Sequence, residues 1–427
     1  MQPYSAVYGL HVLVRLKGFE KLTPINDALK KLLAELEIRR LKTDDIPLDS
    51  ALSRVLAKDI IAETDLPRFD RSAVDGYAVK SKETEGTSQF SPAVFELTDR
   101  GILEVRQTMQ VWTGNLLPES ADAVAMLENT KRKGDKIEVW TPVTPGENVF
   151  KRGEDVSKGG IAVRAGTRLK PQHLGLIAAL GVTEVKVFQR PKIAIIATGN
   201  ELVEIGGKPQ KNQIFETNRL VLSAMCREAG AQPLDLGIAK DDINEILDRV
   251  KTGLERADLI LTSGGTSVGG FDLVPDAVNK IGRPGVVVHG VAMRPAMPTA
   301  LAVVDNTPIV VLPGNPVAAM IGFEVFAKPL IEIMLGLRKT EQRFTAKARM
   351  TKAISTTLGR RTFVRVRVSQ KNDELFAEPI SVRGSSMLST MTKANGYVIV
   401  PENREGLEKG ETVAVHLFDN IDVVDDE

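Results

Sequence analysis

Residues 191–336 alternate between short apolar runs and amphipathic stretches, and this alternation constrains the fold more than any other feature of the chain. Apolar runs of about five residues are typical of buried strands, whereas apolar residues spaced three and four apart are typical of helices. Strands that alternate with helices predict a mostly parallel sheet with helices on both faces. The expected strands are 193–197, 234–238, 259–262, 286–288 and 309–312, and the expected helices are 218–229, 242–256 and 316–335.

A Gly-rich loop, SGGTSVGG at 263–270, follows the third expected strand. Glycines let the backbone approach a ligand closely, and the hydroxyl groups add donors. Ligands of open α/β sheets bind at the carboxyl ends of the strands, so the loop predicts a site for an anion. The spacing is neither GxGxxG nor a Walker A loop, and a tight turn without a ligand is the alternative. The candidate ligand contacts are Ser263, Gly264, Gly265, Ser267 and Gly269.

A second loop, LPGNP at 312–316, precedes the longest expected helix. Asn315 is placed to cap this helix and Pro316 suits its first turn. The free N–H groups at such a helix start attract anions, although a well-capped helix without a ligand explains the loop equally well. Two such loops in one sheet favour a ligand site, with Pro313, Gly314, Asn315 and Pro316 as its contacts.

Acidic residues follow successive strands of the same sheet, where the strand ends converge on one crevice. Each could cap a helix, as Asp242 is well placed to do. One cysteine and four histidines do not build a typical zinc site, so we expect a hard cation such as Mg²⁺. The candidate metal ligands are Glu201, Asp241, Asp242 and Asp272.

The regions on either side of the sheet differ from it. Residues 65–150 and 341–427 contain short strand-like runs separated by turn residues, which predicts two β-rich domains. Near the beginning, Thr23 and Pro24 predict a capped helix over 25–36, and a second helix is expected over 48–56. A further helix is expected around 174–180.

Composition excludes several classes of protein. A net charge of +1 and 5% aromatic residues give no basic field or stacking platform for nucleic acid. No apolar run reaches the length of about 18 residues that a membrane span needs. The first 17 residues lack the basic leader and cleavage site of a signal peptide, and the single cysteine suits a reducing compartment. We therefore expect a cytoplasmic protein, and leave open whether residues 1–17 are ordered.

Several motifs occur in the order found in one known family. The segment FDRSAVDGYAV at 69–79 is accompanied by WTG at 112–114, ADAV with Glu128, NV and RGEDV at 148–156, TGNEL at 198–202, SGGTSVGGFD and LPGNPV. This series closely resembles the molybdopterin molybdenumtransferase family, which comprises MoeA and the E domains of gephyrin and of its plant counterpart. The resemblance runs from about Gly18 to near the C-terminus.

The resemblance implies four domains. Residues 18–62 with 153–190 would form an interrupted α/β first domain, and 63–152 a β-rich second domain. Residues 191–338 would form a MogA-like α/β molybdopterin-binding domain, and 341–424 a C-terminal β-barrel. Family members are homodimers whose active cleft lies between the third domain of one subunit and the second domain of the other, and a MogA-type adenylyltransferase is an expected partner.

The reaction that this resemblance implies inserts molybdate, or tungstate, into adenylylated molybdopterin with Mg²⁺ and releases AMP. Such a site must hold phosphates, a divalent cation and a tetrahedral oxyanion. The positions that match the family's catalytic residues are Asp75, Thr113, Asp155, Glu201 and Asp272, and those that match its oxyanion contacts are Arg294, Pro295, Arg361, Ser385 and Ser386.

The chain departs from the family at neighbouring positions. The family's MKPGKP is MRPAMP here, so that Ala296 replaces a glycine and Met297 stands where a lysine is common. Ala318 stands where PGNPVS would supply a hydroxyl. The loss of a cation and a donor weakens the expected hold on the oxyanion, for which the candidates to compensate are Arg360, Arg361 and Arg365.

Two other functions are consistent with parts of the sequence. A MogA-like nucleotide-handling enzyme, such as a molybdopterin adenylyltransferase or a nucleotide pyrophosphatase, would use the same Gly-rich loops but lacks FDRSAVDGYAV and the barrel. A noncatalytic molybdopterin-binding scaffold is the other, although no low-complexity linker or fused domain favours it. The sequence does not separate molybdate from tungstate, because the two ions have nearly the same size and charge.

Overall fold

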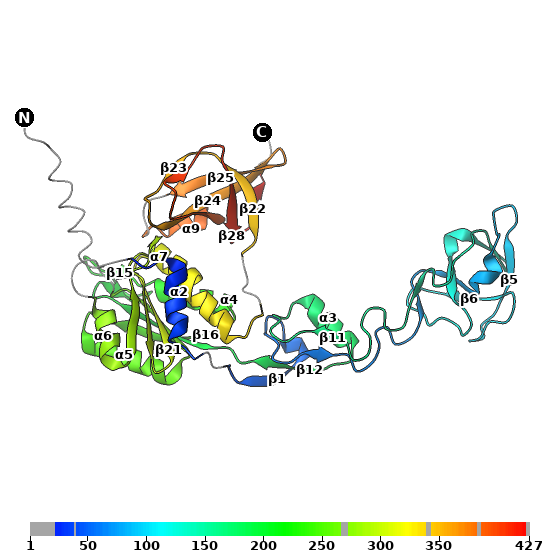
Figure 1. Cartoon of the computed structure of the whole chain (residues 1–427), viewed down its shortest axis with the longest axis horizontal. Helices are drawn as coiled ribbons and strands as arrows, with labels where there is room; N and C mark the ends of the chain where they lie inside the picture. The colour runs from blue at the N-terminus through cyan, green and yellow to red at the C-terminus, as the bar shows by residue number, and fades with distance from the viewer. Residues whose placement is uncertain (1–21, 38–39, 266–271, 339–342, 382–385, 424–427) are drawn as a thin grey trace, which may run out of the picture. The chain divides into compact units, whose positions relative to one another are not determined.

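The computed structural model describes residues 22–37, 40–265, 272–338, 343–381 and 386–423. The chain forms two compact units, Thr43–Val187 and the remainder, each with its own apolar cores (Figure 1). The predictions for residues 1–17, Ser267, Gly269 and Ser385 lie outside the described residues. No helix within the described ranges is both long and apolar enough to cross a membrane.

The larger unit contains the predicted α/β sheet, with the strand order β16-β13-β17-β21-β20-β18. The first four strands are parallel, and β20 runs antiparallel to both its neighbours. The prediction of a mostly parallel sheet is therefore confirmed, with an antiparallel edge. The strands are β13 Lys192–Thr198, β16 Gln232–Ala239, β17 Leu259–Ser263, β18 Pro284–His289, β20 Ala300–Val304 and β21 Thr307–Leu312.

Strand β20 was not among the predicted strands. It is joined to β21 by Asp305 and Asn306, which have φ of 48° and 63°. Two consecutive residues with positive φ form the turn that suits a two-residue hairpin, and Asn and Asp tolerate this conformation. The Asp-Asn pair between two apolar runs was the signal that would have revealed this strand.

Helices cover both faces of the sheet. On one face, Ile246 and Val250 of α5 and Val274 of α6 pack against sheet residues such as Ile196. On the other face, α4 and α7 contact each other, and α4 also contacts β13 and β16. Helix α5 begins at Asp242, whose carboxylate accepts the N–H groups of Asn244 and Glu245, as predicted for a cap. The helices are α4 Asn218–Glu228, α5 Ile243–Arg256, α6 Leu273–Ile281 and α7 Pro316–Gly322.

The long helix predicted over 316–335 is present but contains a π-helical turn. Helix α7 continues through the turn Phe323–Ala327 into α8, Lys328–Met334. Asn315 occupies the N-cap position, as predicted, but its side chain makes no capping hydrogen bond. The Asn315 amide thus remains available for other partners at the helix start.

Two predictions near the N-terminus were wrong in detail. Helix α2, Ile25–Ala34, has Pro24 rather than Thr23 at its N-cap, because Thr23 pairs in extended conformation with Val291. The helix expected over 48–56 is only the 3-10 turn Leu48–Ser50. The chain leaves the helical conformation at Ser53, with φ of 63°, and Leu56 then bridges Val187. The apolar residues that suggested a helix instead belong to the core around the predicted helix α3, Pro171–Ala179.

The smaller unit, Thr43–Val187, contains a six-stranded sheet with the order β7-β4-β6-β5-β9-β8. Alternate residues of β4 enter two different cores, Tyr77 and Val79 on one face and Ala78 on the other, as the two-residue period of a strand requires. The strands are β4 Gly76–Val79, β5 Ala93–Leu97, β6 Gln107–Val111, β7 Ala123–Met126, β8 Thr130–Lys133 and β9 Lys136–Val139.

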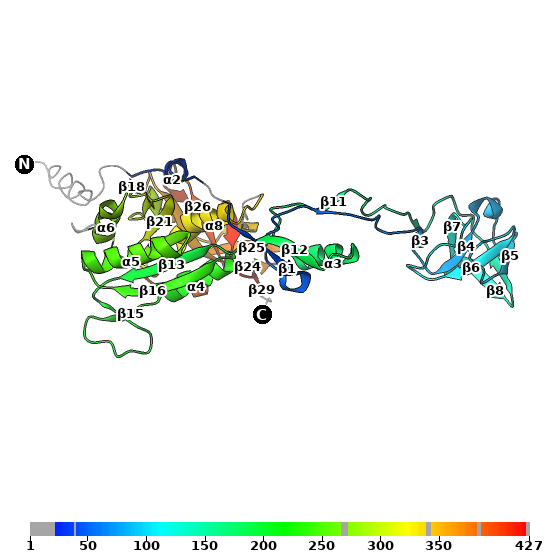
Figure 2. The same cartoon turned by 90° about the horizontal axis from the view of Figure 1, so that it is seen from below.

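Five short strand pairs occur in the two units, and one of them, β23 Ile354–Ser355 with β27 Gly406–Leu407, belongs to the C-terminal part of the larger unit. In the smaller unit β1 pairs with β12, β2 with β11, and β3 with β10. In the larger unit β14 pairs with β15, and the loop between them extends beyond the sheet (Figure 2). The bounds are β1 Thr43–Pro47, β2 Ile60–Ile61, β3 Arg71–Ser72, β10 Val149–Phe150, β11 Ile161–Val163, β12 Glu184–Phe188, β14 Leu202–Val203 and β15 Ile214–Phe215.

The C-terminal region forms a closed five-stranded barrel. Its ring runs β24-β25-β22-β28-β26 and closes because β26 also pairs with β24. A short strand, β19, Met293–Arg294, pairs with the beginning of β24 and so brings the MRPAMP segment against the barrel. The barrel strands are β22 Thr345–Met350, β24 Arg361–Lys371, β25 Glu374–Ser381, β26 Gly396–Val400 and β28 Thr412–Leu417.

Candidate functional site

A cavity of about 620 Å³ lies at the carboxyl ends of the parallel strands of the central sheet. The strand ends β13 and β17, the start of α7 and the β14–β15 pair surround it. It is the crevice that the fold class predicts for a ligand. Among the predicted site residues, its lining contains Glu201, Asp241, Ser263, Gly264, Gly265, Gly314, Asn315, Pro316 and Ser386.

The two glycines that follow β17 allow the loops to approach each other. Gly264 and Gly265 have φ of 95° and 68°, which a residue with a side chain rarely adopts. A Cβ on Gly264 would lie 2.4 Å from the carbonyl oxygen of Thr198, and one on Gly265 would lie 2.5 Å from Val274. On the other side, a Cβ on Gly314 would lie 3.5 Å from the Cα of Gly264. The glycines therefore bring backbone from three loops to one wall of the cavity.

Asn218 links two of these loops by hydrogen bonds. Its side-chain nitrogen donates to the Ser263 hydroxyl at 2.7 Å and to the Gly314 carbonyl at 2.8 Å. Asn218 lines the cavity but is only 7% exposed, so both bonds are largely shielded from bulk water. We did not predict this residue as part of the site. Its position at the first turn of α4, in the sequence FETNR, offered no signal beyond that of a helix start.

An ion network around the buried pair Glu216 and Arg219 supports the same wall. Glu216 accepts the N–H groups of Asn218 and Arg219 and also the Arg219 side chain at 2.9 Å. Arg219 donates further to Asp235 at 2.7 Å and to Glu204. Burial works against the charged form of Arg219, but its bonds to Asp235 and Glu216 outweigh burial and raise its pKa. The network fixes the start of α4 and thereby Asn218.

The four predicted metal ligands do not share one position. Glu201 and Asp241 line the cavity. The Asp241 carboxylate accepts the backbone N–H of Asn200, and the Asn200 side-chain oxygen accepts the backbone N–H of Asp241, each at 3.2 Å. Asp242 caps α5, and Asp272 lies 3.1 Å from the Nε2 atom of His289. Within the described residues, no three His, Cys, Asp or Glu side chains gather as a metal site would require.

A second hollow, of about 300 Å³, adjoins the first at Asn315. It contains the predicted residues Arg294, Pro295 and Pro313, and its other cations are Arg360 and Arg365. Burial lowers the pKa of Arg365. Arg361, which was predicted as an oxyanion contact, instead forms an ion pair with Glu402 at 2.9 Å and does not line this hollow.

The residues that depart from the family pattern meet in this second hollow. Met297 and Ala318 both line it, together with Ala296. Ala296 is buried and has φ of 76°, a conformation that costs a residue with a Cβ about 1–2 kcal/mol. This backbone explains why a glycine suits position 296.

In the smaller unit, Asp75 and Thr113 form a pair. The backbone N–H and the hydroxyl of Thr113 both donate to the same oxygen of Asp75, at 2.8 and 2.9 Å. These bonds, the backbone bond foremost, lower the pKa of Asp75. Asp155, the third predicted residue of this unit, is exposed, and its backbone N–H donates to Leu66. Asp75 and Thr113 are thus together, and Asp155 belongs to a different loop.

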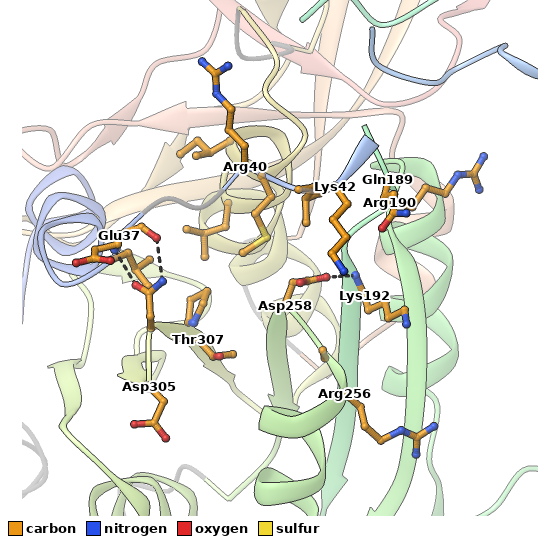
Figure 3. Close-up of a pocket in the computed structure, with 18 of the residues that line it drawn as sticks. Glu37, Arg40, Lys42, Gln189, Arg190, Lys192, Arg256, Asp258, Asp305 and Thr307 are labelled. Atoms are coloured by element: carbon orange, nitrogen blue, oxygen red, sulfur yellow. Dashed lines mark hydrogen bonds between the residues drawn. The ribbon is translucent and has the colours of Figure 1, made fainter. Parts of the chain in front are cut away.

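Another hollow, of about 480 Å³, lies at the opposite ends of the same strands (Figure 3). Its floor contains Leu33, Leu330 and Met334, and its rim carries both cations and carboxylates. In Figure 3 the guanidinium groups of Arg40, Arg190 and Arg256 point away from one another, so these three cations do not converge on one position. The α5 helix ends here, and cations are favourable at a helix C-terminus without any ligand.

Comparison with known proteins identifies the family. Residues 23–181 match the MoeA N-terminal region (domains I and II), residues 194–333 a probable molybdopterin-binding domain, and residues 347–418 the MoeA C-terminal region (domain IV). A putative molybdopterin biosynthesis protein of Methanocaldococcus jannaschii is 33% identical over 94% of this chain and 100% of its own length. The chain belongs to the MoeA family. The predicted family is confirmed, and with it the predicted enzyme class, a transferase.

Two further comparisons agree with this assignment. The molybdopterin molybdenumtransferase of Bacillus subtilis is 35% identical over 88% of this chain and 90% of its own length. The crystal structure of a molybdopterin biosynthesis MoeA protein from Pyrococcus horikoshii OT3 superposes with a TM-score of 0.80 and is 32% identical, covering 93% of this chain and all of that chain. The predicted fold class of the MoeA-family chain is thereby confirmed.

Proposed function

We propose that this protein is a molybdopterin molybdenumtransferase that inserts molybdate or tungstate into adenylylated molybdopterin, with Mg²⁺-dependent release of AMP. The observation that supports this function best is the pair of adjoining hollows that share Asn315. One is built from Gly-rich loops and carboxylates, and the other from arginines. A reaction that joins a phosphate-bearing pterin to a metal oxyanion needs two anion sites side by side.

The larger cavity would bind the phosphates of the pterin substrate. The start of α7 would supply N–H groups, which bind phosphate well at a helix N-terminus, and Gly264, whose own N–H donates to Leu312, leaves room for the phosphate to approach. Asn218 and the Glu216–Arg219 pair hold these groups in place before the substrate arrives, so little ordering remains to be done on binding.

The same cavity offers a fitting place for Mg²⁺. This ion prefers oxygen ligands and is commonly held by one or two carboxylates together with substrate phosphates. The lining has three carboxylates, of which Glu216 is already bound by Arg219 and the Asn218 N–H. We therefore propose Glu201 and Asp241 as the ligands of the ion. When bound, the ion would neutralise charge on the phosphates as the anhydride is cleaved and AMP leaves.

The smaller hollow would bind the oxyanion. Arg294, Arg360 and Arg365 supply the positive charge, and charge-assisted hydrogen bonds from arginine suit a tetrahedral oxyanion. We therefore propose Arg360 and Arg365 in the role first expected of Arg361. They would compensate for the cation and hydroxyl that Met297 and Ala318 do not provide.

Asp75 and Thr113 would act on the substrate from the partner subunit. This part of the proposal rests on the homodimers expected from the family, in which the second domain of one subunit meets the third domain of the other. A MogA-type adenylyltransferase would supply the adenylylated substrate, and a cytoplasmic location suits both proteins.

The test is a turnover assay of the purified protein with adenylylated molybdopterin, MgCl₂ and either molybdate or tungstate. We expect AMP release that depends on the oxyanion and on Mg²⁺. In Asp241→Asn the rate of AMP release should fall by at least about tenfold. Asp242→Asn, which alters only the cap of α5, is the matched control and should retain activity. No AMP release with either oxyanion would contradict the proposal and leave the scaffold function in its place. Consumption of ATP with unmodified molybdopterin would favour the adenylyltransferase.

A further inference from the structure

Several large apolar side chains are exposed around the Asp75–Thr113 pair of the smaller unit. Trp112, which precedes Thr113, is 51% exposed, and Leu116 and Phe150 are 56% and 42% exposed. Isolated exposed apolar residues are ordinary, but neighbouring ones mark a surface that binds something. Leu116 and Phe150 lie on either side of Arg71, and Trp112 belongs to the turn that precedes Leu116.

Arg71 lies between Phe150 and Leu116. It is the strand partner of both, and residues directly opposite on paired strands share a face. The Arg71 guanidinium carbon lies 5.4 Å from the centre of the Phe150 ring. The Nε atom of Arg71 is buried and, among the described residues, has no hydrogen-bond partner. Arg71 as a whole is partly exposed, and a cation beside apolar surface is suited to an anionic group that brings its own apolar body.

The turn that carries Trp112 is held rigidly against the same strand. The backbone N–H of Trp112 donates to the Asn115 side chain at 3.0 Å, and the backbone N–H of Asn115 donates to the Trp112 carbonyl at 2.9 Å. Ser72, the neighbour of Arg71, exchanges backbone bonds with Gly114 and Asn115. Because both sets of bonds fix the backbone of the turn, only the side-chain torsions of the indole remain to be ordered on binding.

We propose that Trp112 and Arg71 form a subsite for a flat nitrogen heterocycle that carries a phosphate. The indole would stack on the ring, and Arg71 would bind the phosphate beside Asp75 and Thr113. Stacking of a base on an aromatic side chain tolerates many rings, so this subsite can contribute to substrate binding. The proposal rests on the proposed function, because the adenylylated pterin offers both such a ring and a phosphate.

The fluorescence of Trp112 provides a direct test. The chain has two tryptophans, so Trp140→Phe leaves Trp112 as the only one. We expect AMP, 6-hydroxymethylpterin or both to quench its emission in a saturable way, and the active ligand identifies which ring is stacked. The Trp112→Phe protein, which retains Trp140, corrects for absorption by the ligands. No saturable quenching by either ligand overturns the subsite, and the exposed surface is then a contact for another protein chain.

The role of Arg71 is tested by comparing AMP with adenosine. In Arg71→Gln we expect the affinity for AMP to fall about tenfold or more, as the loss of a charge-assisted bond predicts, while adenosine is unaffected. Arg132→Gln, on β8 of the same unit, removes an equal charge elsewhere and should change neither affinity. An equal loss for AMP and adenosine in Arg71→Gln contradicts phosphate recognition by this residue.

The turnover assay and the quenching experiment together distinguish a failure of the subsite from a failure of the proposed function. If the wild-type protein releases AMP in the turnover assay but Trp112 shows no quenching, the subsite is wrong and the function stands. If Trp112 is quenched but no AMP is released with either oxyanion, the subsite stands as a heterocycle-binding site and the proposed function is wrong.

Discussion

Thr113 donates two hydrogen bonds to one carboxylate oxygen of Asp75, from its backbone N–H at 2.8 Å and from its hydroxyl at 2.9 Å. Both bonds stabilise the ionised carboxylate and lower the pKa of Asp75 below its ordinary value of 3.8. The pair therefore keeps Asp75 charged in acid that would protonate an isolated aspartate.

Replacing Thr113 by valine tests this relationship. Thr113→Val keeps the backbone bond and removes the hydroxyl bond, so the pKa of Asp75 should rise partway toward 3.8. Because the pKa is lowered in the folded protein, the stabilisation is complete above the ordinary pKa and is lost as the pH falls through the folded pKa. The Thr113→Val protein should lose this stabilisation at a higher pH than the wild type does. Carboxyl NMR titration measures the shift, and Thr130→Val, whose hydroxyl bonds only a backbone carbonyl, should leave Asp75 unchanged.

The wall of the larger cavity predicts a steric effect at Gly264. In Gly264→Ala the new Cβ meets the carbonyl of Thr198 at 2.4 Å, so the loop must move and phosphate-bearing ligands should bind at least about tenfold more weakly. Gly206→Ala is the control, because Gly206 has a similar φ of 88° but no atom within 4 Å of the added Cβ. Thermal unfolding and AMP titration of both variants separate backbone strain from the clash. Equal effects in the two proteins would show that the close approach is unimportant.

Patterns that arise within one element were predictable from the sequence. The parallel strands, α4, α5 and the β-rich regions follow from local periodicity, and Asp242 follows from its position before α5. The helix expected over 48–56 failed because its apolar residues pack against Leu169 and Ile177, far along the chain. Local spacing resembles a helix there, but the long-range core decides the conformation.

The site was predictable as a set of loops and not as a set of contacts. The Gly-rich loop and LPGNP were found because glycine and proline have local conformational meaning. Asn218 was missed because its two partners, Ser263 and Gly314, are 45 and 96 residues away. Likewise the sequence alone does not separate Arg361 from Arg365. Arg361 meets Glu402 because β26, which ends just before Glu402, pairs with the beginning of β24, whereas Arg365 lines the hollow.

Asn218 should be important for ligand binding beyond its effect on stability. Asn218→Ala removes both bonds to the two loops and leaves the Gly314 carbonyl without this donor, at an expected cost of about 1–3 kcal/mol in the free energy of unfolding. The double variant Asn218→Ala with Ser263→Ala should lose less free energy of unfolding than the sum of the two single variants, because the two residues share a bond. Urea unfolding and AMP titration measure the two effects. Asn244→Ala, at an exposed position of α5, should change neither the free energy of unfolding nor the affinity for AMP. Strictly additive costs of Asn218→Ala and Ser263→Ala would exclude the shared bond.

Ala296 should be more stable as glycine. Its φ of 76° is unfavourable for alanine, so Ala296→Gly should raise the free energy of unfolding by about 1 kcal/mol and leave the MRPAMP loop in place. Ala292→Gly, at another buried alanine of the same segment but without positive φ, should lower it by about 0.5–1 kcal/mol. Thermal unfolding compares the two. Destabilisation by both changes would show that position 296 carries no strain.

The oxyanion hollow predicts a gain of affinity from one substitution. Met297 lines this hollow beside Arg294, Arg360 and Arg365, and Met297→Lys places a further cation there. A charge-assisted hydrogen bond contributes about 1.5–3 kcal/mol, so molybdate should bind about tenfold more tightly or better. Calorimetric titration with molybdate and with tungstate measures the gain, and both oxyanions should benefit because charge does not separate them. Met297→Leu, similar in size but neutral, should bind as the wild type does. If Met297→Lys binds no better than Met297→Leu, the hollow is not the oxyanion site, since an added cation there would otherwise meet the anion directly.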